Sequence, residues 1–189
     1  SLGVPRAILE PNTIPGLTNR LLGYFVNRIF VSFRETVRFF PARKVCMTGT
    51  PVRKRLAQLQ PVSGSHFTVL ILGGSQGAHS INQALMNALP QLERSGRPMV
   101  LIHQTGMTDF RWVQEGYHQS LLPHEVHPFI KDVDQAYARA DLVIARAGAS
   151  TIAELMATCL PSILIPYPHA ADDHQRFNAL HLADAGGAE

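Results

Sequence analysis

From residue 67 onward, short apolar runs alternate with segments of helical periodicity, and this alternation predicts the fold. The apolar runs, which we predict to be buried strands, cover residues 67–72, 99–103, 124–128, 141–145 and 162–165. The predicted helices cover residues 78–89, 108–118, 132–138, 151–158 and 174–185. Strands that alternate with helices of this length are typical of parallel βαβ units with right-handed crossovers. We therefore predict an α/β domain with a Rossmann-like parallel sheet.

The pattern before residue 67 is less regular and predicts the end of another domain. Three short strands are predicted at residues 6–9, 29–33 and 45–47, followed in the chain by a loss of periodicity over residues 57–66. Pro and Gly in that stretch are typical of a linker. The predicted organisation is residues 1–56 as the C-terminal part of a first domain, 57–66 as a linker and 67–189 as a second, nearly complete domain. Because the chain starts without Met and stops just after a helix, we expect it to be a piece of a longer protein.

Composition narrows the class of protein. With 46% hydrophobic residues, the 189 residues can build a substantial core. Cys46 and Cys159 lie in apolar runs and are predicted to be reduced core residues, consistent with a cytoplasmic protein. No signal peptide is recognisable, and no apolar run approaches about 18 residues, so the sequence predicts no membrane-spanning segment.

The net charge of +3 hides an asymmetry along the chain. Residues 1–60 carry ten Lys and Arg against two Glu, a balance of +8, so the remaining seven basic and twelve acidic residues give −5. The basic first third suits anionic lipid, a pyrophosphate or nucleic acid, and a solvated basic face is the plainer alternative. Because aromatic-interleaved RNA-binding signatures are absent from the sequence, we predict no nucleic-acid partner.

A glycine-rich loop follows the first strand of the second domain. Its sequence is GGSQG at residues 73–77, and a helix is predicted directly after it. The backbone N–H groups of such a loop and the Ser75 hydroxyl can cradle a phosphate. The spacing is neither that of G-x-G-x-x-G nor that of a P-loop, and tight helix–strand packing is the alternative explanation.

Two further polar stretches are predicted to meet at one rim of the sheet. The helix predicted at Thr151 presents its N-terminus to phosphate or to polar sugar edges, and the loop from Tyr167 to Gln175 follows the next strand. Ligands of open parallel sheets bind outside the carboxyl ends of the strands, where both stretches lie. Glu154 suits the two hydroxyls of a ribose, although its spacing from Thr151 also fits a capping box. Gln175 suits sugar hydroxyls, with simple solvation as its alternative.

Other polar residues give weaker signals. His169, Asp172, Asp173 and His174 share a loop, but their spacing is poor for a metal site, so we predict none. His79, beside the glycine loop, is predicted to be a helix-surface residue, and no residue of the chain is a good candidate for a catalytic base.

Two residues of the first part of the chain lie in turns. Asn12 follows the first predicted strand, and such residues are commonly turn formers only. Arg53 follows a Gly-Thr-Pro turn and offers a planar fork to phosphate, with a surface arginine as the alternative.

The motifs resemble those of the MurG glycosyltransferase family of peptidoglycan synthesis. The resemblance rests on GGSQGA at residues 73–78 followed by Asn82, on FIKDVDQAYARADLVIARAGASTIAEL from Phe129 and on PYPHAADDHQRFNA from Pro166. Upstream, EPNTIPGLTNR from Glu10 and GTPVRK from Gly49 are similar to the EQN-x-x-PGLTN and GNPVR stretches of the same family. The match covers essentially the whole chain, in order.

The resemblance implies a GT-B fold of two Rossmann-like domains and an inverting transfer without a metal or other cofactor. GlcNAc would move from UDP-GlcNAc to the MurNAc C4 hydroxyl of undecaprenyl-pyrophosphoryl-MurNAc-pentapeptide (lipid I), giving lipid II and UDP. The enzyme would be peripheral, on the cytoplasmic side of the bacterial inner membrane, and would touch that membrane through the N-terminal domain.

The resemblance also implies roles for individual residues. Asn12 and Arg53 would contact the donor from the first domain, and Ser75 would bind the diphosphate. The backbone of Ile130 would read uracil, Glu154 would hold the ribose hydroxyls, and Gln175 would bind GlcNAc hydroxyls. Phosphate and ribose would be held by the helix start Ala149, Ser150, Thr151, Ile152, Ala153 and Glu154.

The sequence departs from the family pattern at two positions and lacks one region. Pro11 stands in place of a glutamine and Thr50 in place of an asparagine. The family's glycine-rich N-terminal loop and its histidine, a candidate base, would lie upstream of Ser1, and a C-terminal tail would follow Glu189. We therefore expect weak donor binding and no turnover from this chain alone.

Two other functions compete with this interpretation. A related UDP-GlcNAc epimerase would need catalytic carboxylates and histidines near the sugar, and the sequence shows no such set. A donor-binding module completed by a separate membrane partner is the other alternative, against which residues 1–56 look like the end of a fused domain.

Overall fold

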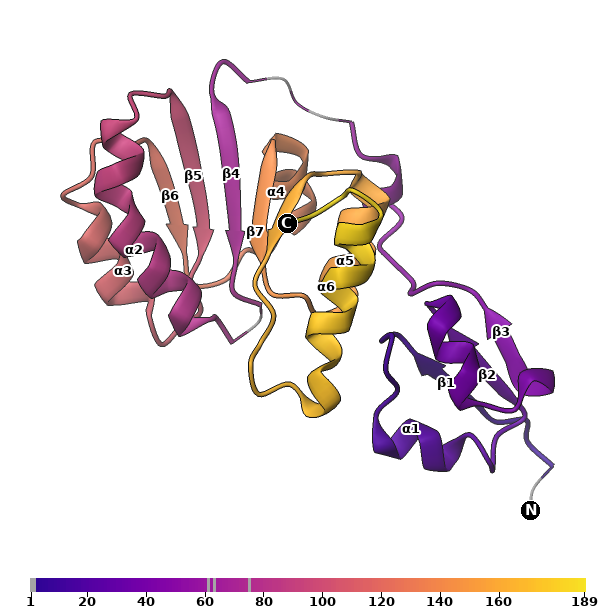
Figure 1. Ribbon diagram of the computed structural model, residues 1–189. Coiled ribbons are helices and arrows are strands. Elements are labelled where there is room, and N and C mark those ends of the chain that lie inside the picture. Colours follow the sequence, from indigo (N-terminus) through magenta and orange to yellow (C-terminus); the bar gives the residue numbers. More distant parts are fainter. Residues whose placement is uncertain (1–2, 61, 63, 75) are drawn as a thin grey trace.

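The strands form two separate parallel sheets (Figure 1). The computed structural model describes residues 3–60, 62, 64–74 and 76–189. The first sheet has the order β1-β2-β3, with bounds Ala7–Glu10, Arg28–Val31 and Val45–Met47. The second has the order β6-β5-β4-β7-β8, with bounds His124–His127, Met99–Gln104, Phe67–Leu72, Leu142–Ala145 and Ser162–Leu164. The predicted α/β class with parallel sheets is confirmed.

The helices follow the predicted alternation closely. Their bounds are α1 Leu17–Leu22, α2 His79–Arg94, α3 Phe110–Tyr117, α4 Val133–Arg139, α5 Ala149–Thr158 and α6 His174–Asp184. The largest difference from the prediction is α2, which continues past Leu89 and through Pro90 to Arg94. Leu92 packs against the same apolar cluster as the first part of the helix, so burial favours the extra turn despite the proline.

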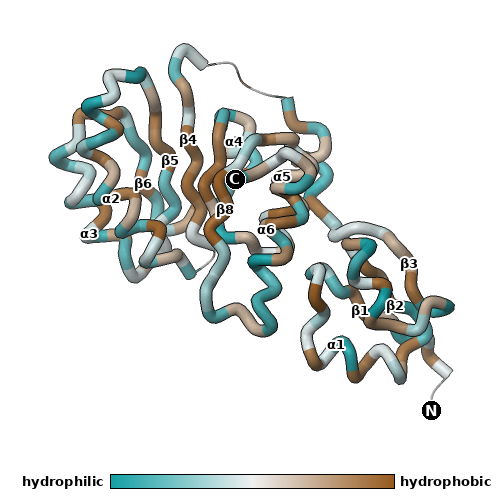
Figure 2. The backbone as a smooth tube through the Cα atoms, in the orientation of Figure 1, coloured by the Kyte–Doolittle hydropathy of each residue, from teal (hydrophilic) through white to brown (hydrophobic). Residues whose placement is uncertain are grey.

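The second sheet is buried on both faces, and the side chains of its central strand alternate between them. Val69 and Ile71 of β4 pack against α2 and α3, whereas Leu70 and Leu72 pack on the side of α4, α5 and α6. Figure 1 shows the two layers of helices, and Figure 2 shows β4 as a hydrophobic strand over most of its length. A near-continuous apolar run is the expected signature of a parallel strand covered on both sides.

The strand order reverses at β4. The chain passes from β4 to β5 and β6 on one side and then returns to β7 and β8 on the other. Such a reversal leaves a crevice between the loops at the carboxyl ends of the two strands that flank the reversal, here β4 and β7. The topology therefore places a binding crevice where the glycine loop faces the turn that opens α5.

The first sheet has its own small core and also contributes to the larger one. Val26, Ile29, Val31 and Phe40 form the core of the first sheet. Phe33 and Leu56 are instead buried in the cluster that covers α5 and α6. Val62, within the predicted linker, donates its N–H to the carbonyl of Ala138 at 2.8 Å. The segment between the sheets is therefore packed along the second sheet's helices over part of its length.

The two cysteines are free, but neither is a core residue. Cys46 is half-buried, and Cys159 is exposed at the end of α5, in a left-handed conformation with φ of 54°. The prediction that both are core residues was wrong: Cys159 is the C-cap that follows the last turn of α5, and Cys46 lies in the short strand β3, no residue of which is fully buried. In the described part of the chain, no helix combines the length and the apolar character needed to cross a membrane.

Candidate functional site

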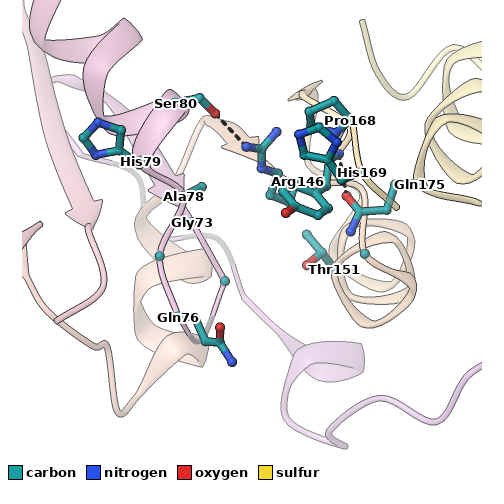
Figure 3. A pocket seen from close by; sticks show the side chains of 14 residues that line it. Gly73, Gln76, Ala78, His79, Ser80, Arg146, Thr151, Pro168, His169 and Gln175 are labelled. Atoms are coloured by element: carbon teal, nitrogen blue, oxygen red, sulfur yellow. Dashed lines mark hydrogen bonds between the residues drawn. The ribbon is translucent and has the colours of Figure 1, made fainter. Parts of the chain in front are cut away.

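A cavity of about 610 Å³ opens at the predicted crevice (Figure 3). Its walls are the glycine loop and start of α2, the turn between β7 and α5, and the loop after β8. They include Gly74, Arg146, Gly148, Tyr167 and Gln175. The prediction that the helix start at Thr151 and the loop from Tyr167 to Gln175 share one rim is confirmed, and the glycine loop lines the same cavity. The ligand roles of the individual residues stay predictions.

The glycine loop is held by a close crossing with the loop after β5. Gly77 and Gly106 both have a φ of 81°. A Cβ added to Gly77 would lie 2.2 Å from the carbonyl oxygen of Thr105, and one added to Gly106 would lie 2.5 Å from that of Gln76. Tight packing therefore explains Gly77, although the packing is against the loop after β5 and not between helix and strand, as the alternative had it. Ser75, the predicted diphosphate ligand, lies outside the described residues.

A buried polar network fixes the loop after β5 against α2. The Asn82 amide donates to the carbonyl of Thr105 at 2.9 Å and to Asp109 Oδ2 at 2.7 Å. The same Asp109 oxygen lies 2.9 Å from Nδ1 of His79. Burial alone would raise the pKa of Asp109, but the hydrogen bonds from Asn82, Trp112 and His79 outweigh it and lower the pKa. His79 has a side chain that is 70% exposed, in agreement with the surface prediction, and it also lines the cavity.

His103 extends this network into the core. It is fully buried, its Nε2 lies 3.0 Å from Asn82 Oδ1, and its Nδ1 lies 3.3 Å from the Tyr117 hydroxyl. Because both amide hydrogens of Asn82 are already donated, Oδ1 accepts from the Nε2–H of His103, and Tyr117 donates to Nδ1. Burial lowers the pKa of His103 to about 4, so the ring is neutral at pH 7.

Replacing His103 with glutamine is expected to flatten the dependence of stability on pH. The histidine binds a proton near pH 6.5 in the unfolded chain but only near pH 4 in the folded one, so its contribution to stability falls as the pH is lowered between these values. The loss is about 2 kcal/mol between pH 7 and pH 5. Denaturant unfolding at several pH values measures the slope. The variant Gln114→Asn changes no titratable group on the exposed side of α3 and should keep the wild-type slope, while an unchanged slope in His103→Gln would contradict the assignment.

Arg146 is a wall residue that the sequence analysis missed. Its guanidinium donates to the carbonyls of Ile165 and Pro166 at 3.0 and 2.9 Å and to the Ser80 hydroxyl at 2.6 Å. Figure 3 shows it between Ser80 and the loop that carries His169. Burial lowers its pKa, but the charge stays, since arginine titrates far above pH 7. The sequence did contain a hint of this role, because a charged residue directly after a buried strand lies at the rim where ligands bind. Only the small residues that follow Arg146 in the turn entered the prediction.

Glu154 is not part of a capping box. The helix α5 begins at Ala149 with Gly148 as its N-cap, so Thr151 is already inside the helix, and no side chain makes a capping hydrogen bond there. Glu154 lies in the second turn, one turn later than predicted, and accepts a hydrogen bond from the Tyr137 hydroxyl at 3.1 Å. Burial raises the pKa of Glu154, and the Tyr137 hydrogen bond and the Arg53 charge offset only part of that rise.

Arg53 reaches from the first part of the chain toward the same carboxylate. Its guanidinium lies 3.4 Å from Asp134 Oδ1 of α4, with the Arg53 side chain 56% exposed. An exposed pair of this kind contributes little to stability. The arrangement nevertheless brings Arg53 and Glu154, two predicted donor contacts, to one place.

Asn12 lies apart from the cavity, in a polar seam between the two sheets. Its Oδ1 accepts from the Asn178 amide at 3.1 Å, and its own amide donates to Glu10 at 3.2 Å. Asn178 Oδ1 accepts from the N–H and the hydroxyl of Thr13, both at 3.1 Å, and its amide also reaches the carbonyl of Ala147 at 3.2 Å. These contacts account for all four hydrogen-bonding positions of the buried Asn178 amide.

Most of the remaining predicted residues line one of three cavities. Thr151 lines the first, and Ala149, Ile152 and Ala153 line a smaller one of about 210 Å³. Ile130 lines a third cavity of about 360 Å³ together with Phe129 and Gln135. Gln175 lines the first cavity, and its Oε1 accepts the N–H of Tyr167 at 2.9 Å. Across the described residues, no three His, Cys, Asp or Glu side chains gather closely enough to hold a metal ion.

Comparison with known proteins shows that this fold, with a cavity at its strand reversal, is the GT-B fold of glycosyltransferases. Residues 68–189 match the family model described as "Glycosyltransferase family 28 C-terminal domain", which is more than half of the chain. The chain therefore belongs to glycosyltransferase family 28, and within it to the MurG family.

The assignment to the MurG family rests on sequence relatives and on a solved structure. The chain is 46% identical over 190 residues to the UDP-N-acetylglucosamine–N-acetylmuramyl-(pentapeptide) pyrophosphoryl-undecaprenol N-acetylglucosamine transferase of Myxococcus xanthus, covering 99% of this chain and 50% of that protein. The corresponding transferase of Solibacter usitatus is 45% identical, with 98% and 52% covered. The crystal structure of Acinetobacter baumannii MurG superposes with a TM-score of 0.79 at 36% identity, over 100% of this chain and 53% of that one. The chain thus spans about half the length of these relatives.

Proposed function

We propose that this chain is part of an inverting glycosyltransferase that moves GlcNAc from UDP-GlcNAc to the MurNAc C4 hydroxyl of lipid I, producing lipid II and UDP. The observation that carries the proposal is the cavity at the strand reversal, formed by a glycine loop, a helix N-terminus and a polar loop in a chain of the MurG family. The glycine loop and the helix N-terminus offer N–H groups to a diphosphate, and the polar loop offers side chains to sugar hydroxyls.

The donor would lie along the carboxyl ends of the strands. The glycine loop and the N-terminus of α5 would hold the diphosphate, Glu154 the ribose hydroxyls, Gln175 the GlcNAc hydroxyls and the backbone of Ile130 the uracil. Departure of UDP develops negative charge on the diphosphate. The unpaired N–H groups at the start of the 10-residue α5 can stabilise this charge. The acceptor hydroxyl needs a general base, which we place outside residues 1–189.

The first part of the chain fits the acceptor side of such an enzyme. We propose that residues 1–56 belong to the domain that meets lipid I and the membrane surface, that residues 57–66 link the domains and that residues 67–189 bind the donor. The balance of +8 over residues 1–60 favours the anionic cytoplasmic face of the bacterial inner membrane. The enzyme would then be peripheral and would use no cofactor, with UDP-GlcNAc as its substrate.

Replacing Gln175 with alanine is expected to weaken the binding of UDP-GlcNAc about tenfold while leaving the binding of UDP unchanged. Besides the N–H of Tyr167, the amide would contact only the sugar part of the donor, and a tenfold loss matches one hydrogen bond of about 1.4 kcal/mol. Calorimetric titration of UDP-GlcNAc, UDP-glucose and UDP into residues 1–189 measures this. Gln114→Ala, on the exposed side of α3, is the matched control.

This titration distinguishes an error in the proposed donor site from an error in the role of Gln175. No binding of UDP-GlcNAc by the folded wild-type chain, at ligand concentrations high enough to detect the weak binding expected of this chain, would overturn the proposed donor site. Equal losses for UDP and UDP-GlcNAc in Gln175→Ala would leave the donor site in place and remove Gln175 from the sugar position. Transfer itself is tested with the full-length enzyme, by incorporation of labelled GlcNAc into lipid I.

A further inference from the structure

Gln104 connects two loops that lie on either side of its strand. It is the last residue of β5, and its side chain is nearly fully buried, with the residue 6% exposed. Its amide nitrogen donates to the carbonyl of Gly74 at 2.8 Å, and its amide oxygen accepts the N–H of Ile130 at 3.1 Å. Because β5 lies between β4 and β6, this one side chain spans the loops at the carboxyl ends of both neighbours.

The two loops form the walls of different cavities. Gly74 lines the cavity of about 610 Å³, whereas Ile130 lines the cavity of about 360 Å³. Gln104 lines neither of them and lies between the two walls. Both of its hydrogen bonds end on main-chain atoms, so it fixes the course of the backbone on both sides without depending on the side chains there.

We propose that Gln104 is a positioning residue for the nucleotide part of the donor. It holds the base-binding backbone at Ile130 at a fixed separation from the diphosphate-binding loop at Gly74. This inference rests on the proposed function, since it takes the two cavities as the sugar-diphosphate and base positions of one ligand.

The physical basis is the coupling of two linked binding events. Once the base is seated, the diphosphate binds at an effective concentration that depends on how well the two positions match the length of the ligand. A planar amide hydrogen-bonded at both ends holds that spacing before the ligand arrives, which removes an ordering cost from binding. Loss of the amide should therefore weaken a ligand that spans both positions more than a ligand that occupies one.

A purely stabilising role makes a different prediction. If Gln104 only satisfied two buried main-chain groups, its loss would lower thermal stability and weaken every ligand by a similar factor. The ratio of the dissociation constants of uridine and UDP separates the two roles, because uridine reaches only the base position.

The test uses residues 1–189 with Gln104→Leu, which removes both hydrogen bonds at similar volume, and Gln104→Asn, which keeps the amide but is too short to span both loops. The variant Gln114→Leu makes the same change on the exposed face of α3 as a control. We expect the affinity for UDP to fall about tenfold in both Gln104 variants and the affinity for uridine to fall less than threefold, so that the ratio drops. The asparagine variant serves if the leucine variant does not fold.

Two results would overturn the inference in distinguishable ways. A uridine-to-UDP ratio that stays within twofold of the wild-type value, with a lowered melting temperature, would show that Gln104 only stabilises the loops. Absence of UDP binding by the folded wild-type chain would overturn the proposed function and this inference together.

Discussion

Replacing Glu154 with alanine is expected to weaken the binding of UDP about 100-fold. A carboxylate that accepts hydrogen bonds from ligand hydroxyls contributes about 1.5–3 kcal/mol, and 100-fold corresponds to about 2.7 kcal/mol. The side chain is half-buried and oriented by the Tyr137 hydroxyl at 3.1 Å, so its position is fixed before the ligand binds. Glu154→Gln keeps one uncharged acceptor, and a loss of about tenfold is expected there.

The role of Glu154 is tested most sharply with a modified nucleotide. 2′-Deoxy-UDP lacks one of the two hydroxyls, so the wild-type chain should prefer UDP over it, and the preference should disappear in Glu154→Ala. Glu115→Ala, an exposed carboxylate on α3, should keep the preference. If Glu154→Ala still discriminates as strongly as the wild type, the ribose is held elsewhere.

The burial of Glu154 also predicts how the affinity for UDP depends on pH. Burial raises the pKa of Glu154 above the usual range of a glutamate. Binding requires the ionised form, so affinity should fall as the pH is lowered, beginning at a higher pH than for a solvated glutamate. This part of the pH dependence should be missing from Glu154→Ala.

Replacing Gly106 with alanine is expected to destabilise the chain by about 3 kcal/mol or more. A non-glycine residue in the left-handed region costs about 1–2 kcal/mol, and forcing an atom into a packed site adds about 1–3 kcal/mol. Gly106 has both penalties, since its φ is 81° and the new Cβ would lie 2.5 Å from the carbonyl oxygen of Gln76. For a chain of this size the melting temperature should fall by about 10 °C.

The backbone cost and the steric cost can be distinguished with a second glycine. Gly96 also has a positive φ, 65°, but a Cβ added there would meet nothing within 4 Å. Gly96→Ala should therefore cost only about 1 kcal/mol, from the backbone conformation alone. Thermal unfolding of both variants gives the comparison. Equal losses would show that the crossing of the two loops yields easily and does not fix the glycine loop.

The sequence predicted the elements and their order well because periodicity reports local structure. Parallel pairing and the shared rim then followed from topology, since all carboxyl ends of a parallel sheet lie on one side. The end of α2 was missed because Pro90 is a local signal for stopping, whereas the burial of Leu92 is a property of the assembled core. The capping box at Thr151 failed for the related reason that the helix starts two residues earlier.

The polar contacts of the site were largely beyond sequence reasoning. Arg146 contacts Ser80, which lies 66 positions away, and Thr13 contacts Asn178 across 165 positions. Gln104 was missed because one glutamine at the end of an apolar strand carries no pattern. Such pairings are decided by which loops the topology brings together, and spacing along the chain does not record that.

The polar seam between the sheets also acts as a mechanical linkage. Asn178 holds Asn12 and Thr13 with one set of hydrogen bonds and the carbonyl of Ala147 with another. Ala147 directly precedes Gly148, the N-cap of α5. A displacement of the first sheet would therefore pull on the backbone that sets the direction of α5. Each of these hydrogen bonds contributes only about 1 kcal/mol net, so burial of Phe33 and Leu56 against the helices of the second sheet opposes separation of the two sheets more than the seam itself does.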